Sequence, residues 1–309
     1  MPELPEVETI ARGLASRVTG DIIESIWLGR KPEPLKSPAR EIAATVENTR
    51  IATVRRVGKH IVFDLERMDR VGRTLLSVKS QNPEKSPKRS ARNSKHHSSS
   101  LPAEADMSVR PTQHWIVHLG MTGRLQVCDA QSEILKHTHA ILKLASGREL
   151  RFVDPRRFGR LALVSEPFTG PGSEPLTITK PAFAALFGGR KLSIKAALLN
   201  QSLLHGVGNI YADESLFRAG IRPTRQAGRL PRKRLDRLHT ALRSVLRAAI
   251  RAGGSSVSDY VDANGDRGFF QIQHCVYMRT GEPCLVCGTP IRRVVLAGRG
   301  THFCPVCQK

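Results

Sequence analysis

The sequence predicts an α+β chain of several parts: an antiparallel β-sandwich or barrel with one leading helix, a mainly helical second half, and a C-terminal zinc site. β-type runs fill the N-terminal half, and no helical pattern alternates with them as a parallel α/β sheet would require. Helical periodicity dominates the second half, and two Cys-x2-Cys pairs lie at its end. The 309 residues are enough for about two domains.

The leading helix is expected over residues 5–19. Pro5 suits the first helical position, and Val7, Ile10, Leu14 and Val18 recur at three- and four-residue spacing. Runs of strand-forming residues follow, bounded by turn residues; they cover Ile22–Leu28, Ala52–Glu66, His114–Val127 and Ala140–Val164.

The second half contains a helix–turn–helix pattern. Helices are expected around 193–204 and 209–219, joined by the glycine-rich stretch 205–208. The free backbone N–H groups at the start of the second helix can then bind a phosphate. A longer helix is expected to begin after Pro231 and to stop at Gly253-Gly254.

Composition also predicts the domain boundaries. Residues 79–110 are dense in Ser, Pro, Lys and Arg without periodicity, and we expect a disordered insertion there. A Pro- and Gly-rich linker is expected over 166–175. The predicted units are therefore 1–165, 176–273 and a zinc finger over 275–309.

Net charge points to a polyanionic partner. The chain carries 49 Lys and Arg against 27 Asp and Glu, a net charge of +22. Such a field favours nucleic acid or an anionic membrane. Aromatic residues are 5% and no apolar run approaches the roughly 20 residues of a membrane span, so nucleic acid is favoured. The plainer alternative is a merely basic protein. The chain start lacks the pattern of a secretory signal, so we expect a cytoplasmic protein.

The terminal cysteines have the spacing of a four-thiolate zinc site. Cys284-x2-Cys287 and Cys304-x2-Cys307 are separated by sixteen residues. Because four thiolates leave no open position for water, we expect one structural zinc ion. Arg299, between Gly298 and Gly300, is expected at the tip of a hairpin that this metal anchors, within reach of a phosphate.

Pro2 and Glu3 are candidates for chemistry at the chain start. A small residue after Met1 permits removal of the initiator, which leaves Pro2 with a free secondary amine. Such an amine, with a reference pKa of about 8, can attack an electrophilic sugar carbon and form an iminium ion. The adjacent Glu3 can move protons at the sugar ring. The plainer alternative is that Pro2 only directs removal of Met1.

Five motifs occur together in a set order, and together they resemble the bacterial formamidopyrimidine-DNA glycosylases, which repair oxidised purines. They are MPELPEVET at the start, HLGMTG at 118–123, DPRRFG at 154–159, GVGNIYADE at 206–214 and AGRGTHFCPVCQ at 297–308. The resemblance covers the chain except 79–110. It implies an N-terminal β-sandwich, a helix–two-turn–helix domain, a zinc-finger β-hairpin, and a monomer acting on damaged double-stranded DNA.

The resemblance also implies roles at the reaction centre. Pro2 matches the nucleophile that attacks C1′, and Glu3 matches the acid/base that assists opening of the sugar ring. Lys59 matches the proton donor of β-elimination, and Arg299 matches the δ-elimination residue at the lesion phosphate. Glu6 matches a residue that supports the entrance of the active site.

Further positions are expected to contact DNA. His137, Arg156 and Arg190 align with DNA-binding positions of the family, and Lys195 and Asn209 are added as expected phosphate contacts. Met121, Arg156 and Phe158 match the residues that fill the gap left by an everted nucleotide. Residues 253–270 resemble the loop that covers the everted purine.

Two rival interpretations stay open. The endonuclease VIII branch, which prefers oxidised pyrimidines, usually begins Met-Pro-Glu-Gly-Pro, whereas this chain has Leu4. A noncatalytic zinc-containing DNA-binding protein is the other rival. The joint presence of Pro2, Glu3, Lys59 and Arg299 argues against it.

Overall fold

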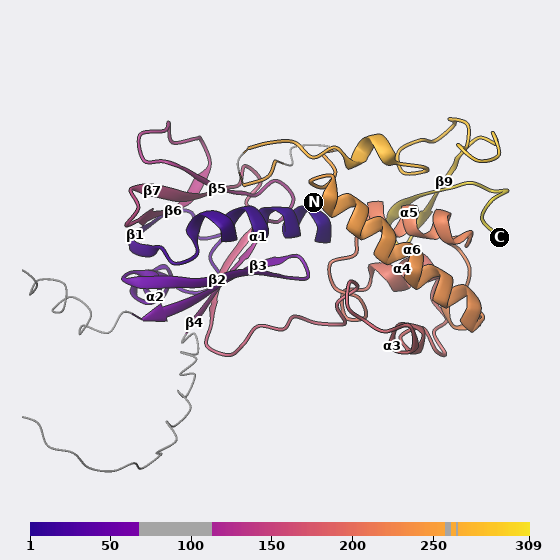
Figure 1. The fold of residues 1–309 in the computed structure, drawn as a ribbon, viewed down its shortest axis with the longest axis horizontal. Helices are drawn as coiled ribbons and strands as arrows, with labels where there is room; N and C mark the ends of the chain where they lie inside the picture. Colours follow the sequence, from indigo (N-terminus) through magenta and orange to yellow (C-terminus); the bar gives the residue numbers. More distant parts are fainter. Residues whose placement is uncertain (68–112, 257–260, 264) are drawn as a thin grey trace, which may run out of the picture.

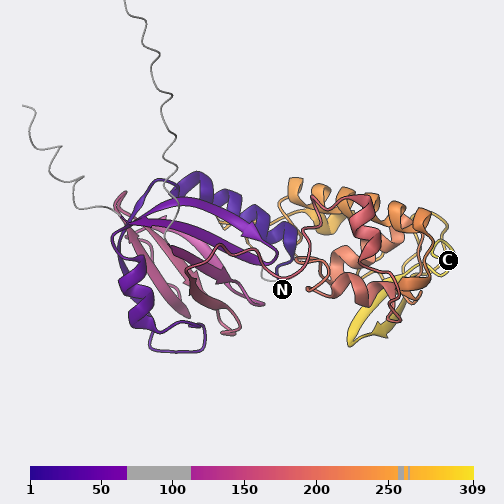
Figure 2. The same cartoon turned by 90° about the horizontal axis from the view of Figure 1, so that it is seen from below.

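The computed structural model describes residues 1–67, 113–256, 261–263 and 265–309. The expected insertion over 79–110 lies outside the described residues. The N-terminal sheet and the helices α1 (Leu4–Val18) and α2 (Ala39–Val46) form one lobe, and the remaining helices form a second lobe with the C-terminal hairpin (Figures 1 and 2). The N-terminus lies where the two lobes meet. Within the described residues, no helix is both long enough and apolar enough to cross a membrane.

The leading helix α1 (Leu4–Val18) connects the two lobes. Its apolar positions Val7, Ile10, Leu14 and Val18 are buried in the core of the first lobe, as their spacing predicts. Leu4, at its first turn, is instead buried in the core of the helical lobe, and its backbone N–H donates to the carbonyl of Gly206 at 3.0 Å. The residues just before α1 are therefore held at the junction of the lobes.

The first lobe is a sandwich built from one open antiparallel sheet. Its strand order is β5-β7-β6-β1-β2-β3-β4-β8. The halves are joined where β1 pairs with β2 at Ile22↔Arg50 and Ile23↔Thr49, and α1 contacts strands of both halves. The end strands β5 and β8 are not neighbours in that order, so the sandwich is confirmed over the barrel. The strands are β1 (Ile22–Leu28), β2 (Thr49–Val57), β3 (His60–Arg67), β4 (Gln113–His118), β5 (Arg124–Asp129), β6 (Thr138–Leu144), β7 (Arg148–Val153) and β8 (Arg160–Val164).

The helical lobe packs around a second apolar core. Its helices are α3 (Lys180–Ala185), α4 (Ile194–Leu199), α5 (Asn209–Ala219) and α6 (Arg232–Arg251), with short 3-10 helices at Ala227–Arg229 and Phe270–Gln273. α5 matches the expected range 209–219. α4 ends earlier than expected because the chain turns at Asn200, whose side chain accepts the N–H of Ser202 at 2.9 Å.

A small third core lies under the C-terminal hairpin of β9 (Arg292–Leu296) and β10 (Arg299–Phe303). The buried carboxylate of Glu214 on α5 accepts the backbone N–H groups of Cys275, Val276 and Tyr277, with shortest contacts of 2.9 Å. These bonds fix the segment that leads to the hairpin against the helical lobe.

Candidate active site

Glu3 lies where the start of α1 faces the start of α5. The N–H of Ile210 donates to Glu3 Oε1 at 3.1 Å, and the N–H of Tyr211 is 3.5 Å from Oε2. Burial raises the pKa of Glu3 to about 7, and nearby Glu6 adds to that rise while Lys59 opposes it. A carboxyl group with such a pKa can both give and take a proton near neutral pH.

Gly208 makes room for the Glu3 side chain. A Cβ atom on Gly208 would lie 2.2 Å from Cδ of Glu3 and 2.4 Å from Oε1. The backbone at Gly208 is extended, with φ −129°, so the lack of a side chain matters here for space rather than for conformation. The sequence pattern predicts only a turn for the glycines of this stretch and does not reveal this contact.

Glu6 is buried and holds three segments together. Its Oε2 accepts the Glu3 N–H at 2.8 Å, and its Oε1 accepts the Ser255 N–H at 2.8 Å and the Tyr211 hydroxyl. Burial raises the pKa of Glu6. Because fixed donors occupy both oxygens, its geometry suits support of Glu3 rather than proton transfer to a substrate.

Lys59 lies at the turn between β2 and β3, where Gly58 has φ +60°. Its side chain is 9% exposed, and burial lowers its pKa. Glu3 and Glu6 favour its charged form, whereas Arg299 disfavours it. Lys59 therefore interacts electrostatically with Glu3 and Glu6 at the chain start and with Arg299 near its end.

A cavity of about 160 Å³ joins the chain start to Lys59. Met1 and Lys59 both line it, together with three histidines that sequence reasoning missed: His60, His118 and His205. Removal of Met1 would therefore open the Pro2 nitrogen toward the side of the site that holds Lys59. Burial lowers the pKa of His118 to about 4, so this ring is neutral near pH 7.

The hairpin that carries Arg299 is anchored from beneath. Lys195 Nζ and Asn209 Nδ2 both donate to the carbonyl of Gly300, at 2.9 and 3.0 Å. Asp213 Oδ1 lies 2.7 Å from Lys195 Nζ, and Asp213 Oδ2 accepts the His302 N–H at 2.9 Å. The Arg299 side chain itself is exposed at the first position of β10.

This network corrects the expectation for Lys195. Its side chain is 0% exposed and its ammonium group is paired with a carboxylate that is also 0% exposed. In this arrangement Lys195 cannot reach a phosphate, and its contacts hold the Arg299 hairpin instead. Asn209 is partly buried and directs its amide toward the same carbonyl.

A second cluster gathers Met121, Arg156 and Phe158 around the buried Asp154. Asp154 accepts the Thr122 hydroxyl at 2.6 Å and the Gly159 N–H at 2.7 Å, which joins the two loops. Met121 and Phe158 are 41% and 53% exposed, although both are large apolar residues. The Arg156 guanidinium lies 4.8 Å from the centre of the Phe158 ring. Such an exposed apolar pair with an arginine suits insertion into a base stack.

The remaining expected DNA contacts lie apart from the reaction centre. His137 is exposed and its carbonyl accepts the Asp154 N–H at 3.0 Å, which places it beside the second cluster. Arg190 lies on the helical lobe after α3, and its Nε donates to the Leu186 carbonyl at 2.6 Å. In the expected loop over 253–270, residues 257–260 and 264 lie outside the described residues.

The four terminal cysteines fit one zinc ion. Their sulfur atoms all lie within 4.8 Å of one another, with 3.9 Å between Cys284 and Cys307 and 3.5 Å between Cys287 and Cys304. A tetrahedral site with Zn–S bonds of about 2.3 Å separates its sulfurs by about 3.8 Å. All six cysteines of the chain are free of disulfides.

Removal of zinc is expected to unfold the hairpin, because the core beneath it is small. Chelation should release about one zinc ion per chain and make the hairpin that carries Arg299 sensitive to protease. Metal analysis and limited proteolysis of the same sample would measure both effects, with readdition of zinc as the control. A zinc-free sample whose hairpin resists protease as well as the zinc-loaded protein would contradict this structural role.

The fold and site together define a zinc-containing helix–two-turn–helix protein with a candidate reaction centre at its N-terminus. The formamidopyrimidine-DNA glycosylase N-terminal domain matches residues 1–161, the H2TH domain of the same enzymes matches 170–261, and a zinc finger found in FPG and IleRS matches 281–309. The chain belongs to the formamidopyrimidine-DNA glycosylase family.

Individual relatives agree along the whole chain. The formamidopyrimidine-DNA glycosylase of Solibacter usitatus is 43% identical, with all of both chains covered. Among solved structures, a Lactococcus lactis FPG mutant in complex with a Fapy-dG containing DNA has a TM-score of 0.80 and 30% identity, again over all of both chains. The MutM (Fpg) protein of Thermus thermophilus has a TM-score of 0.76 and 38% identity, over 99% of this chain and 98% of that one.

Proposed function

We propose that this protein is a bifunctional DNA glycosylase and abasic-site lyase that excises oxidised purines such as 8-oxoguanine and formamidopyrimidines. The observation that supports this proposal most directly is that Glu3, with its raised pKa, lies with Lys59 and the chain start at the junction of the two lobes. Its relatives support the same class of reaction. Action on chromosomal DNA would bring the protein to the nucleoid.

Base excision begins at Pro2 once Met1 is removed. The Pro2 nitrogen attacks C1′ of the damaged nucleotide, the N-glycosidic bond breaks, and its electron pair leaves with the base, which takes up the proton released from the Pro2 nitrogen. Glu3 in its protonated form gives a proton to the sugar-ring oxygen, so the ring opens and an iminium ion forms between Pro2 and C1′. The deprotonated Glu3 can then take a proton back.

Strand cleavage follows from the iminium ion. The iminium ion acidifies the C2′ hydrogen, and transfer of that proton to the Glu3 carboxylate expels the 3′ phosphate with the C3′–O electron pair by β-elimination. Loss of the C4′ proton to solvent then expels the 5′ phosphate in a second elimination. Lys59 supplies a proton during β-elimination, which its lowered pKa favours. Arg299 holds the phosphate at the lesion during the second elimination.

Binding requires that the damaged nucleotide leave the stack. Met121 and Phe158 fill the resulting gap, and Arg156 addresses the orphaned base. His137 and Arg190 contact phosphates outside this gap, where contacts position the duplex without reading its sequence.

The rate of base excision is expected to pass through a maximum and to fall at alkaline pH. The neutral amine of Pro2, with a reference pKa of about 8, becomes more abundant as pH rises, whereas the protonated form of Glu3, with a pKa of about 7, is lost. Single-turnover rates on an 8-oxoguanine duplex between pH 6 and pH 9.5 would measure both limbs of the profile, with duplex affinity at each pH as the control. A rate without any alkaline decline would contradict proton donation by Glu3.

Asp213→Asn is expected to lower the ratio of δ- to β-elimination product several-fold. The change removes the charge that pairs with Lys195 and therefore loosens the hairpin that carries Arg299. The double variant Asp213→Asn/Lys195→Met removes both buried charges, and we expect it to recover folding stability without recovering the ratio. An unchanged product ratio in the single variant, at full zinc content, would refute this positioning role.

The proposed function is tested by comparing release of 8-oxoguanine, opposite cytosine, with release of an oxidised pyrimidine. Faster release of the purine is expected, since Leu4 follows the purine branch. Release of the pyrimidine alone would place the protein with endonuclease VIII. Tight binding of both duplexes without excision, after confirmed removal of Met1, would favour the noncatalytic alternative.

A further inference from the structure

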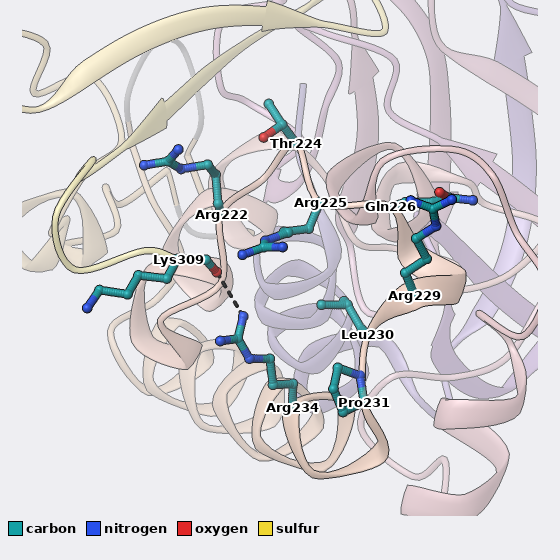
Figure 3. Close-up of a pocket in the computed structure, with 9 residues that line it drawn as sticks. All are labelled: Arg222, Thr224, Arg225, Gln226, Arg229, Leu230, Pro231, Arg234 and Lys309. Atoms are coloured by element: carbon teal, nitrogen blue, oxygen red, sulfur yellow. Dashed lines mark hydrogen bonds between the residues drawn. The ribbon is translucent and has the colours of Figure 1, made fainter.

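A hollow of about 760 Å³ lies on the helical lobe (Figure 3), and Glu3, Lys59 and Arg299 are not among its lining residues. It is formed by the segment between α5 and α6, the first turn of α6 and the last residue of the chain. We call it the arginine pocket. Its lining residues include Arg222, Arg225, Arg229, Arg234 and Lys309.

The arginine pocket collects positive charge. Its lining contains four arginines and one lysine but no aspartate or glutamate, so it stays cationic even when a terminal carboxylate on Lys309 is counted. None of the four arginines forms a salt bridge with a side chain that the structure describes, whereas Arg55, Arg56 and Arg151 each pair with a carboxylate. Because like charges repel, such a cluster favours the binding of an anion.

Two of the arginines are held in place by the protein. Arg234 donates to the main-chain oxygen of Lys309 at 2.9 Å, and Arg222 donates to the Pro305 carbonyl at 2.9 Å. Arg225 and Arg229 are exposed. Figure 3 shows the guanidinium groups of Arg225 and Arg234 extending into the same space, with Arg229 on the other side. A guanidinium fixed by one bond keeps further N–H donors for a ligand.

The start of α6 adds to this preference. Its first turn contains no acidic residue and instead carries Arg232, Lys233 and Arg234. Cations at a helix N-terminus are disfavoured by the helix dipole, whereas an anion there is stabilised. The sequence thus places positive charge where it costs stability, which is typical of a site selected for binding.

We propose that the arginine pocket is a phosphate-binding site separate from the reaction centre, and that it takes phosphodiester groups of a nucleic-acid strand. Its volume exceeds that of one phosphate ion, and its cations are spread across both walls, which suits successive phosphates of a chain. The site would engage DNA beyond the segment that contains the lesion. This second site would explain positive charge that takes no part in the excision mechanism.

The test reverses charge at the two exposed arginines in the zinc-loaded full chain. Arg225→Glu/Arg229→Glu is compared with Arg40→Glu/Arg237→Glu, which changes net charge equally at exposed positions outside the pocket. Affinity is measured against salt for a short lesion duplex and for a long one. For the long duplex, the slope of log K against log salt is expected to be shallower by about two in the pocket variant than in the parent protein, because each lost phosphate contact reduces the slope by about one.

Further outcomes decide between the sources of phosphate. The short-duplex affinity and excision rate of the pocket variant should remain unchanged, which separates this site from the proposed reaction. An equal loss in the control variant, or an equal loss on the short duplex, would overturn a separate site. Calorimetric titration with inorganic tripolyphosphate tests whether the pocket binds a small polyphosphate instead. If the pocket variant lost tripolyphosphate binding but kept the parental affinity for the long duplex, the assignment to nucleic acid would be overturned.

Discussion

Glu3→Gln is expected to reduce base excision by about 10²- to 10⁴-fold, the usual contribution of a positioned acid or base. Glutamine retains an oxygen that can accept the Ile210 N–H but cannot donate the proton that opens the sugar ring. The alkaline decline of the rate should disappear with the carboxyl group. Single-turnover release of 8-oxoguanine would measure the loss.

Folding and binding serve as controls for Glu3→Gln. Because burial raises the folded-state pKa of Glu3 above its unfolded value, the ionised carboxylate opposes folding, and stability is lost as pH rises from about 4.5 to about 7. The variant should therefore be no less stable than the parent at pH 8, and duplex affinity should be nearly unchanged. Full excision activity would refute the role assigned to Glu3.

Gly208→Ala is expected to lower base excision by about 10²-fold, comparable to the effect of misplacing a catalytic group by roughly 1 Å. The added methyl group cannot occupy a position 2.2 Å from Glu3 Cδ, so the carboxyl group or the start of α5 must shift. The loss should appear in the maximal single-turnover rate, because Gly208 lies beneath Glu3 and not among the expected phosphate contacts. The pH at which the rate declines should also move, since the bonds from Ile210 and Tyr211 help to set the pKa of Glu3.

Gly188→Ala provides the matched control in the same lobe. The nearest atom to its added Cβ would be the Ala185 carbonyl oxygen at 3.6 Å, an ordinary contact. This variant should keep the parental rate and pH profile. If Gly208→Ala were equally active, the close packing of Gly208 on Glu3 would not control the position of the carboxyl group.

Local patterns in the sequence were sufficient for the leading helix and for the helix after the glycine-rich turn. The apolar spacing of α1 and the glycines before α5 predicted helices close to their observed limits. The eight-residue α2 (Ala39–Val46) was missed, because it buries two residues, Ile42 and Val46, and offers little periodicity. The run Ala52–Glu66 is divided by the turn at Gly58 and Lys59, which its apolar pattern does not reveal.

The site depended on contacts that no local pattern encodes. Lys195 lies on α4 and Asp213 on α5, with a turn between the two helices, and their burial as a pair appears in neither segment alone. The packing of Gly208 on Glu3 likewise joins opposite parts of the chain. Sequence reasoning therefore identified candidate residues, but it could not distinguish a phosphate contact from a buried support, as the case of Lys195 illustrates.

Borohydride trapping tests the central claim, that Pro2 is the nucleophile, most directly. The protein lacking Met1 would be incubated with an 8-oxoguanine·cytosine duplex and borohydride, and the adduct located by peptide mass spectrometry. The account predicts one covalent link between C1′ of the lesion sugar and the nitrogen of Pro2, and a Pro2→Gly control should not form an adduct with the same efficiency. An adduct on Lys59, or excision without any trapped adduct, would contradict it.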